Sequence, residues 1–313
     1  MVGKRLEEVL MPSVVSASSE LITSIKGEGK ISVRETLAHS LPLKTMSLML
    51  GLEQQDEQFL SNITGGVIQA LSGEEPFKSI GQARHVEFAQ VVRRLMAERR
   101  AHPTDDLLSS LMNSSDGKGF VLSEEEICSF MTLLLIAGVE TTELGLLNFW
   151  YRLLQYPELL PRLAEDDELL NGAFTEFMRM DGPVAYEDRT LAADHELHGV
   201  QMKAGDVVRV AMISANNDDS VFANPRDFNP ERSDLVLERE HRSGGVHDGR
   251  ANHVGFGLGK HFCIGYLLAR AEITELTKQF LQSTKPRLAA DHVGDIQMHW
   301  LWWSVEDLIL DLR

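Results

Sequence analysis

One short stretch of the sequence places glycines around a cysteine, and these residue types can bind a metal or a flat ligand. It reads Phe-Gly-Leu-Gly-Lys-His-Phe-Cys-Ile-Gly over residues 256–265. Glycine lets the backbone approach a bulky group and adopt positive φ. Cys263 comes just before a predicted helix, 264–282, whose first amides stabilise a thiolate. The stretch therefore predicts a sulfur ligand for a metal, although most lone cysteines beside a helix are simply buried.

Two nucleotide-binding interpretations of the same glycines fail on spacing. A P-loop needs a glycine five residues before its Gly-Lys pair and Ser or Thr after it, whereas Val254 and His261 occupy those positions. The dinucleotide fingerprint counted from Gly257 needs a third glycine where Phe262 stands. Neither nucleotide site is predicted.

The stretch resembles the haem-binding signature of the cytochromes P450, F-G-x-G-x-H-x-C-x-G, at every specified position. The resemblance implies that Cys263 is the axial thiolate ligand of the iron in haem b. It also implies that the other signature residues contact the haem or its propionates, or make room for the porphyrin. These residues are Phe256, Gly257, Gly259, His261 and Gly265.

A second segment, Ala-Gly-Val-Glu-Thr at 137–141, lies in a long apolar helix and is similar to the family's oxygen-activating segment. Ala137 and Gly138 leave room for a planar cofactor, and the Thr141 hydroxyl can bond back to the Ala137 carbonyl, which loosens one turn. Glu140 can bring protons inward. The alternative is that Gly138 serves helix packing while Glu140 and Thr141 are solvated.

Two further charged motifs occur in the family's order. Glu176 and Arg179 are three residues apart on a predicted helix, a spacing that alone indicates only a weak surface pair. In the family this Glu-x-x-Arg pairs with the arginine of a Phe-x-Pro-x-Arg segment, here Arg232, which implies a buried structural network. Arg189 takes the place of the arginine that pairs with a haem propionate; otherwise it is an ordinary strand-edge charge.

The elements that carry these residues are predicted to be mainly helical up to residue 180. Apolar residues recur at three- and four-residue spacing in the segments 5–24, 34–50, 54–71, 79–100 and 105–113. A long helix is predicted to begin at Ser123, which can form a capping box with Glu126, and to end before Pro157. Shorter helices are predicted near 158–165 and 168–180.

After residue 183 the sequence changes to short β-prone pieces at 186–190, 196–202 and 207–212, interrupted by Gly199 and by Ala-Gly-Asp at 204–206. The polar segment 233–251 predicts a surface excursion, and its histidines are assigned no metal. Because no repeat or linker interrupts the chain, we expect one domain over 1–313 that is mainly α with a minor β part. It is predicted to be helical over 1–180 and mixed over 181–313, in a cytochrome P450-like fold.

Composition limits the remaining possibilities. With 313 residues, 43% hydrophobic and 25% charged, the chain is globular rather than disordered or fibrous. Its 47 Asp and Glu against 30 Lys and Arg give a formal charge of -17, which disfavours nucleic acid and anionic lipid as partners. Two cysteines cannot build a disulfide framework, and no signal or membrane segment is recognised. These features predict a cytoplasmic protein.

The resemblance implies a haem-thiolate monooxygenase that inserts one atom of O2 into a small organic substrate. Electrons would come from a separate ferredoxin or flavodoxin-type donor. The N-terminal part of a typical member has no counterpart here, so we expect a fragment, or a naturally short member covered by a partner or a second copy. The alternative is a haem-binding or haem-free remnant that acts as a scaffold. A peroxide-driven variant is disfavoured by the pair Glu140 and Thr141.

Overall fold

The computed structural model of the chain describes residues 8, 10–52, 55–104, 106–115, 119, 121–237, 246–298 and 302–312. Part of the predicted surface excursion, 238–245, lies outside the described residues. The chain divides into two compact units, of which the first comprises 1–143 and 267–276 and the second 144–266 and 277–313. The prediction of a single domain stays a prediction.

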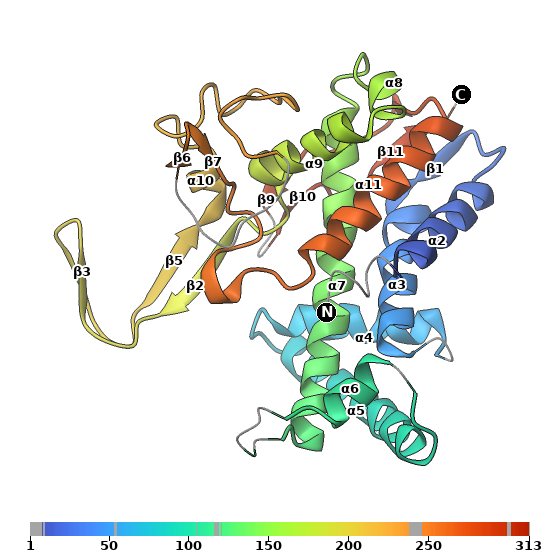
Figure 1. Cartoon of the computed structure of the whole chain (residues 1–313), viewed down its shortest axis with the longest axis vertical. Coiled ribbons are helices and arrows are strands. Elements are labelled where there is room, and N and C mark those ends of the chain that lie inside the picture. The colour runs from blue at the N-terminus through green and yellow to red at the C-terminus, as the bar shows by residue number, and fades with distance from the viewer. Residues whose placement is uncertain are drawn as a thin grey trace. The chain divides into compact units, whose positions relative to one another are not determined.

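The first unit is built mainly from helices (Figure 1). Its elements are α2 (Met11–Ser24), β1 (Lys30–Ser32), the π-helical turn η2 (Arg34–Ala38), α3 (Ser40–Leu50), α4 (Glu57–Ala70), α5 (Phe77–Ala101), α6 (Leu107–Met112) and the first two thirds of α7 (Glu124–Leu153). Helices α4 and α5 pack against each other, and α2 packs against α3. Buried side chains of α3 to α7 form the core, among them Met46, Phe88, Val92, Met131 and Leu135.

Side-chain caps fix where several of these helices begin. The carboxylates of Asp56 and Asp106 accept hydrogen bonds from backbone amides at the starts of α4 and α6. At the start of α7 the amide of Ser123 donates to Glu126 Oε2 at 2.8 Å, and the amide of Glu126 donates to Ser123 Oγ at 3.2 Å. The predicted capping box is therefore present.

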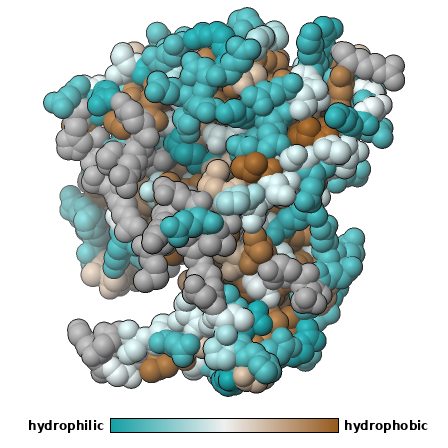
Figure 2. Space-filling view, turned by 45° about the vertical axis from the view of Figure 1, so that its right-hand side comes forward, coloured by the Kyte–Doolittle hydropathy of each residue, from teal (hydrophilic) through white to brown (hydrophobic). Residues whose placement is uncertain are grey.

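Helix α7 is long and apolar because it runs through packed protein on much of its surface. By length and hydropathy it could cross a membrane, yet 61% of its most apolar window is buried within the protein. On the face shown in Figure 2 hydrophilic residues predominate, and apolar residues lie in separate patches. The helix ends at Leu153, earlier than the limit that Pro157 sets.

The second unit combines helices with short antiparallel strands. Its helices are the end of α7, α8 (Leu160–Leu163), α9 (Asp167–Asp181), α10 (Met212–Asn216), the 3-10 turn η3 (Gly259–His261) and the two ends of α11 (Tyr266–Ser283). Its strands are β2 (Tyr186–Thr190), β3 (His195–Leu197), β4 (Val200–Met202), β5 (Val207–Ala211), β6 (Val246–His247), β7 (Arg250–Ala251), β8 (Arg287–Leu288), β9 (Gln297–Met298), β10 (Trp303–Ser304) and β11 (Ile309–Asp311).

The strands pair locally. β2 pairs with β5 in a register that places Tyr186 opposite Ala211, and both lead to the β3–β4 hairpin (Figure 1). The β-prone piece 196–202 forms two strands, because the chain turns at His198 and at Gly199, where the sequence indicates a break; their φ values are 50° and 79°. Glycine allows this left-handed turn, which divides the segment into β3 and β4.

Aromatic side chains form much of the second core. Phe149 of α7 contacts Phe174 and Phe177 of α9 at ring-centroid distances of 6.2 and 5.1 Å. Trp150 stacks on Phe280 at 4.1 Å with an interplanar angle of 12°. All five side chains are at most 3% exposed, so these contacts fix α9 and the end of α11 on the end of α7.

Candidate functional site

The cysteine loop of the second unit presents Cys263 between the turn η3 and the first residue of α11. The amide of Cys263 donates to the carbonyl of Phe256 at 2.9 Å, which closes the loop. Burial raises the pKa of the Cys263 thiol, while hydrogen bonds from the backbone amides of Gly265 and Tyr266 lower it, with a net increase. Amides directed at sulfur are the arrangement that stabilises a ligating thiolate.

The loop fits a flat apolar group such as haem. Gly257 and Gly259 adopt φ of +70° and +67°, and a Cβ on Gly259 would meet nothing within 4 Å. The neighbouring Leu258 and Ile264 are 41% and 63% exposed. An open glycine turn, flanked by exposed apolar side chains next to a sulfur, leaves room for a macrocycle and provides apolar contacts for it.

Aromatic contacts hold Phe256 beside this loop. Its ring lies 6.1 Å from the ring of Tyr266 and 6.4 Å from that of Phe262, measured between centroids. On its other side it stacks on Phe174 of α9 at 6.3 Å. The structure therefore brings Phe256 and Cys263 together, and α9 supports the loop.

Glu176, Arg179 and Arg232 meet in one buried network in the second unit. The Arg179 guanidinium donates to both oxygens of Glu176 at 2.8 Å, and Arg232 Nη1 donates to Glu176 Oε1 at 3.0 Å. Their exposures are 0%, 1% and 6%. Sequence reasoning gave no role to two further members, Asn216, whose carbonyl accepts from Arg179, and Asp234, which accepts from Arg232. Neither residue belongs to the Glu-x-x-Arg or the Phe-x-Pro-x-Arg motif.

Two residues expected at the haem propionates have solvent-accessible positions. Arg189 lies on β2, is exposed, and donates to Glu187 Oε2 at 3.0 Å and to the Asp188 carbonyl at 2.9 Å. His261 ends η3 and is exposed. Their contact with propionates stays a prediction.

In the first unit, α7 carries Glu140 and Thr141. The Thr141 hydroxyl donates to the Ala137 carbonyl at 2.7 Å, as the sequence predicted, although α7 continues through this turn as an α-helix. Ala137 is exposed and Thr141 is half-buried, as is Glu140, one residue before it. Burial and the charge of Glu143 raise the pKa of Glu140. Glu140 is thus suited to carrying a proton at higher pH than an ordinary glutamate.

Gly138 was expected to leave room for a planar cofactor, but it faces a neighbouring helix. A Cβ on this residue would lie 2.4 Å from Met46 Sδ, so Gly138 is small because α3 packs against α7 at this point. The open face of the helix is formed instead by Leu133 and Ala137, of which Leu133 is 54% exposed. The packing alternative described above explains Gly138, and any cofactor contact of Gly138 stays a prediction.

A second group of charges, Arg34, His39 and Glu143, surrounds the same part of α7 and was not recognised in the sequence. Arg34 Nε donates to Glu143 Oε1 at 2.6 Å, and His39 Nδ1 bonds Glu143 Oε2 at 2.7 Å. Burial raises the pKa of Glu143, but His39 and Arg34 lower it more, so the net direction is down. The hydrogen bond to Glu143 raises the pKa of His39 against the opposing effect of burial. The one sequence feature that could have indicated this group is Glu143 itself, an acidic residue three positions after Glu140.

Glu272 of α11 is a buried acid in the first unit that the sequence did not indicate. It is 1% exposed and accepts hydrogen bonds from the hydroxyls of Thr45 and Thr142. Burial raises the pKa of Glu272 to about 8 although both hydroxyls oppose this change. Glu272 is therefore protonated at neutral pH and joins α3, α7 and α11 as a neutral acid.

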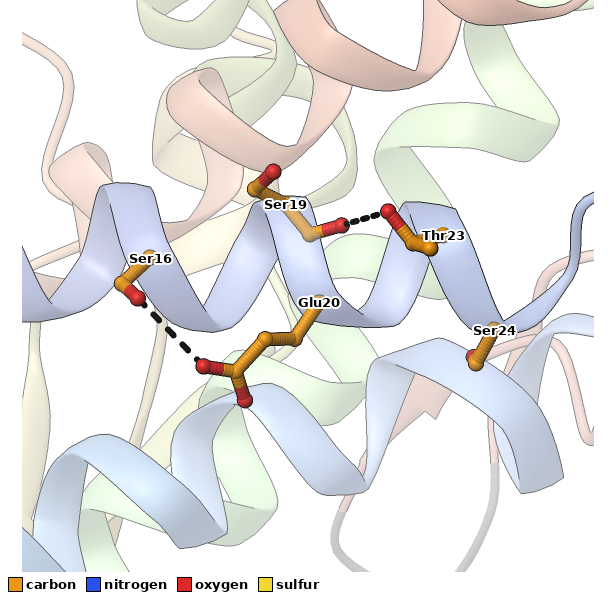
Figure 3. A pocket seen from close by; sticks show the side chains of 5 residues that line it. All are labelled: Ser16, Ser19, Glu20, Thr23 and Ser24. Carbon is orange, nitrogen blue, oxygen red and sulfur yellow. Dashed lines mark hydrogen bonds between the residues drawn. The ribbon is translucent and has the colours of Figure 1, made fainter.

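A hollow of about 430 Å³ lies on α2, away from any predicted site residue along the chain. Its lining is Ser16, Ser19, Glu20, Thr23 and Ser24 (Figure 3). Two hydrogen bonds join lining residues to each other. The Ser16 hydroxyl donates to the Glu20 carboxylate at 3.3 Å, and the Thr23 hydroxyl donates to the Ser19 carbonyl at 2.8 Å. The hollow is open and is lined by α2 alone, so we assign it no ligand.

Related proteins were found by sequence. The family model described as Cytochrome P450 matches residues 74–300. The chain is 32% identical to the steroid C26-monooxygenase of Mycolicibacterium smegmatis over 276 residues, which cover 87% of this chain and 64% of that relative. It is 30% identical to the polyketide biosynthesis cytochrome P450 PksS of Bacillus subtilis over 269 residues, which cover 86% of this chain and 62% of PksS.

Solved structures share the fold. The structure of PksS from Bacillus subtilis 168 has a TM-score of 0.86 at 28% identity and covers 99% of this chain and 75% of PksS. The structure of P450BioI, in complex with an acyl carrier protein ligated to hexadec-9Z-enoic acid, has a TM-score of 0.85 at 27% identity. The match covers 99% of this chain and 76% of P450BioI.

A glycine-rich loop that presents a cysteine before a long helix, in a mainly α fold, fits the class of haem-thiolate proteins, in which a cysteine thiolate holds the haem iron. The chain belongs to the cytochrome P450 family. The sequence resemblance and the mainly α fold with a minor β part are thereby confirmed. The chain spans about two thirds of the length of the curated relatives it matches, 64% and 62% for the two named here. Membership of this family implies iron bound as haem through a cysteine thiolate.

Proposed function

We propose that the chain is a haem-thiolate monooxygenase that inserts one atom of O2 into a small organic substrate and reduces the other to water. Haem b is the proposed cofactor, and a ferredoxin or flavodoxin-type protein is the proposed electron donor. The observation that carries the proposal is the cysteine loop, in which two backbone amides are directed at a partly buried sulfur beside open glycines. The names of the relatives as monooxygenases support it.

In this proposal residues of the second unit bind the haem through its iron, its ring and its propionates. Cys263 would bind the iron through its sulfur, Phe256 would shield that sulfur, and Gly257 and Gly259 would leave room for the macrocycle. Arg189 and His261 are the proposed partners of the propionates, for which a guanidinium fork and an imidazole are suited. When bound, a haem with a thiolate ligand supplies cleavage of the O–O bond.

The first unit supplies protons in this proposal. Glu140 has a pKa above the ordinary value, so it can hold and release a proton nearer to neutral pH. The Thr141 hydroxyl donates to the Ala137 carbonyl, which leaves the lone pairs of its oxygen able to accept a hydrogen bond. Reduction of one oxygen atom to water consumes two protons, and Glu140 is their proposed last protein donor.

The test is the absorption spectrum of the purified protein after reduction and exposure to carbon monoxide. Wild type should show the strongly red-shifted Soret band of a thiolate ligand, and Cys263→Ala should lose it. Cys128 is the matched control, because it is buried and bonds weakly to the Ala89 carbonyl at 3.7 Å, so Cys128→Ala should keep the band. A band of neutral-ligand haem, or no haem in wild type, would favour the scaffold function instead.

The proposal also extends to the substrate, the cellular location and the source of electrons. We propose a small organic substrate without naming it, because the relatives' names do not agree on one. One relative is named a steroid C26-monooxygenase and another a polyketide biosynthesis cytochrome P450. The charge of -17 supports the proposal that the chain binds neither nucleic acid nor membranes, and its two cysteines, too few for a disulfide framework, support a cytoplasmic location. Product formation with NAD(P)H and a donor protein, compared with peroxide alone, separates the monooxygenase from a peroxide-driven enzyme.

A further inference from the structure

A hydrogen-bonded series of side chains leads from a half-buried position to the part of α7 that carries Glu140. The Ser61 hydroxyl of α4 lies 3.0 Å from His39 Nε2, and His39 Nδ1 lies 2.7 Å from Glu143 Oε2. The side chain of His39 is 29% exposed and that of Glu143 is 6% exposed. All of these residues belong to the first unit. The series therefore runs from solvent into the protein.

Glu143 and Glu140 lie three residues apart on α7, so they share one face of the helix. Side chains at this spacing have Cβ atoms about 5–6 Å apart, a gap that two glutamates can close directly or through one water. Arg34 Nε occupies Glu143 Oε1 at 2.6 Å, which leaves Oε2 for His39. The carboxylate is thereby held with one oxygen on a fixed cation and the other on a group that can gain and lose a proton.

We propose that Ser61, His39 and Glu143 form a relay that carries protons from solvent to Glu140. This inference rests on the proposed function, because the protons delivered to Glu140 are the ones that function consumes. The three residues act through Glu140, so they are positioning residues rather than catalytic ones. No part of the relay depends on a contact with the cofactor.

The relay is balanced in protons and moves no electrons. A proton from solvent reaches His39 Nε2 by way of the Ser61 hydroxyl, and the proton on Nδ1 passes to Glu143 Oε2. Glu143 passes it to the carboxylate of Glu140 and returns to its ionised form beside Arg34. His39 recovers its first state by tautomer exchange or ring reorientation, so one proton enters for each proton delivered.

The groups that face His39 determine how the relay depends on pH. They are Glu143 and Glu140 from α7, Arg34 from η2 and the neutral Ser61 from α4. The two carboxylates raise the pKa of His39, and Arg34 lowers it. Because His39 delivers protons only while it can be protonated, delivery decreases as pH rises through its pKa. Removing the charge of Glu143 should move that decrease to lower pH.

The first experiment needs no cofactor and follows the histidine rings of the full chain by NMR during a pH titration. His39 is assigned as the signal missing from His39→Gln. We expect its pKa to fall in Glu143→Gln and, by a smaller amount, in Glu140→Gln. His85 is the control, because its Nδ1 bonds Thr132 at 3.1 Å on the same unit, and its titration should not change. If neither glutamate variant shifts His39, the relay is overturned.

The second experiment measures turnover of the haem-loaded enzyme. His39→Gln and Glu143→Gln should each reduce kcat by about tenfold, which is within the range for lost proton transfer, with KM unchanged. Peroxide release and the solvent isotope effect should both increase, and neither variant should lower the rate further when Glu140→Gln is already present. His85→Gln should behave as wild type.

The two experiments separate two kinds of failure. If the NMR titration shows the linkage but Glu140→Gln leaves turnover and peroxide release unchanged, the proposed proton role of Glu140 and the relay are both wrong. If Glu140→Gln impairs turnover while His39→Gln and Glu143→Gln keep wild-type rates and isotope effects, only the relay is wrong. A folded state in each variant is checked by the same NMR spectra.

Discussion

The buried acid Glu272 makes stability depend on pH at the scale of a single residue. The pKa of this side chain is about 8 in the folded protein and 4.5 as an ordinary glutamate. Between these values the unfolded chain releases the proton and the folded chain keeps it, so the free energy of unfolding decreases as pH rises. Glu272→Gln keeps both threonine partners and cannot ionise.

We therefore expect the free energy of unfolding of wild type to decrease from about pH 5 to about pH 8. In Glu272→Gln the decrease should be smaller, and at about pH 8 the difference should be on the order of a few kcal/mol. Urea unfolding followed by circular dichroism at several pH values measures the difference. The exposed Glu28 is the control, because Glu28→Gln should retain the wild-type slope. Equal slopes in wild type and Glu272→Gln would contradict the assignment of a neutral acid.

Single residues were predictable from the sequence where their partners are close in the chain. The cysteine signature and the bond from Thr141 to Ala137 depend on fixed local spacing, and both could be read from it. Glu143 has its partners more than a hundred residues away, at Arg34 and His39, and nothing in the local pattern of α7 indicates them. Burial of Glu272 has the same cause, because it depends on how three helices pack.

At the scale of elements, Gly172 allows α9 to approach the segment that carries Arg232. A Cβ on Gly172 would lie 2.5 Å from the backbone carbonyl oxygen of Pro230, which cannot move aside as a flexible side chain does. Gly172→Ala should therefore destabilise the protein by about 1–3 kcal/mol through overpacking. Denaturant unfolding measures this effect.

The matched control is Gly65, in the interior of α4, where a Cβ would meet nothing within 4 Å. Gly65→Ala should stabilise the protein by roughly 0.5–1 kcal/mol, because alanine costs less backbone entropy in a helix. Opposite signs for the two variants are the expected result. A neutral or stabilising Gly172→Ala would mean that α9 and Pro230 separate at little cost.

Helices were predicted well where the sequence has a clear capping motif or apolar periodicity. The capping box at Ser123 and Glu126 gave the start of α7, and apolar periodicity gave α4, α5 and α9 within a few residues. Gly199 indicated the break within the β-prone piece 196–202, and the chain turns there, at His198 and Gly199.

At the scale of the whole molecule, the charge of -17 opposes the compact state. Raising the ionic strength from about 0.01 M to about 0.15 M shortens the screening distance from about 30 Å to about 8 Å. We expect Tm to increase by roughly 2 °C, which about 1 kcal/mol of relief would give in a chain of this size. Differential scanning calorimetry checks this, and a Tm that falls with salt would show that attractive ion pairs outweigh the repulsion.

The division into two units has a practical consequence for optical measurements. All four tryptophans, Trp150, Trp300, Trp302 and Trp303, have sequence positions in the second unit. Intrinsic fluorescence of the cofactor-free chain therefore reports on that unit alone, whereas far-ultraviolet circular dichroism reports on the helices of both. Coincident unfolding curves from the two signals would mean that α7 and α11, which contribute residues to both units, couple them into one cooperative transition. Separate curves would let the stability of each unit be measured without cutting the chain.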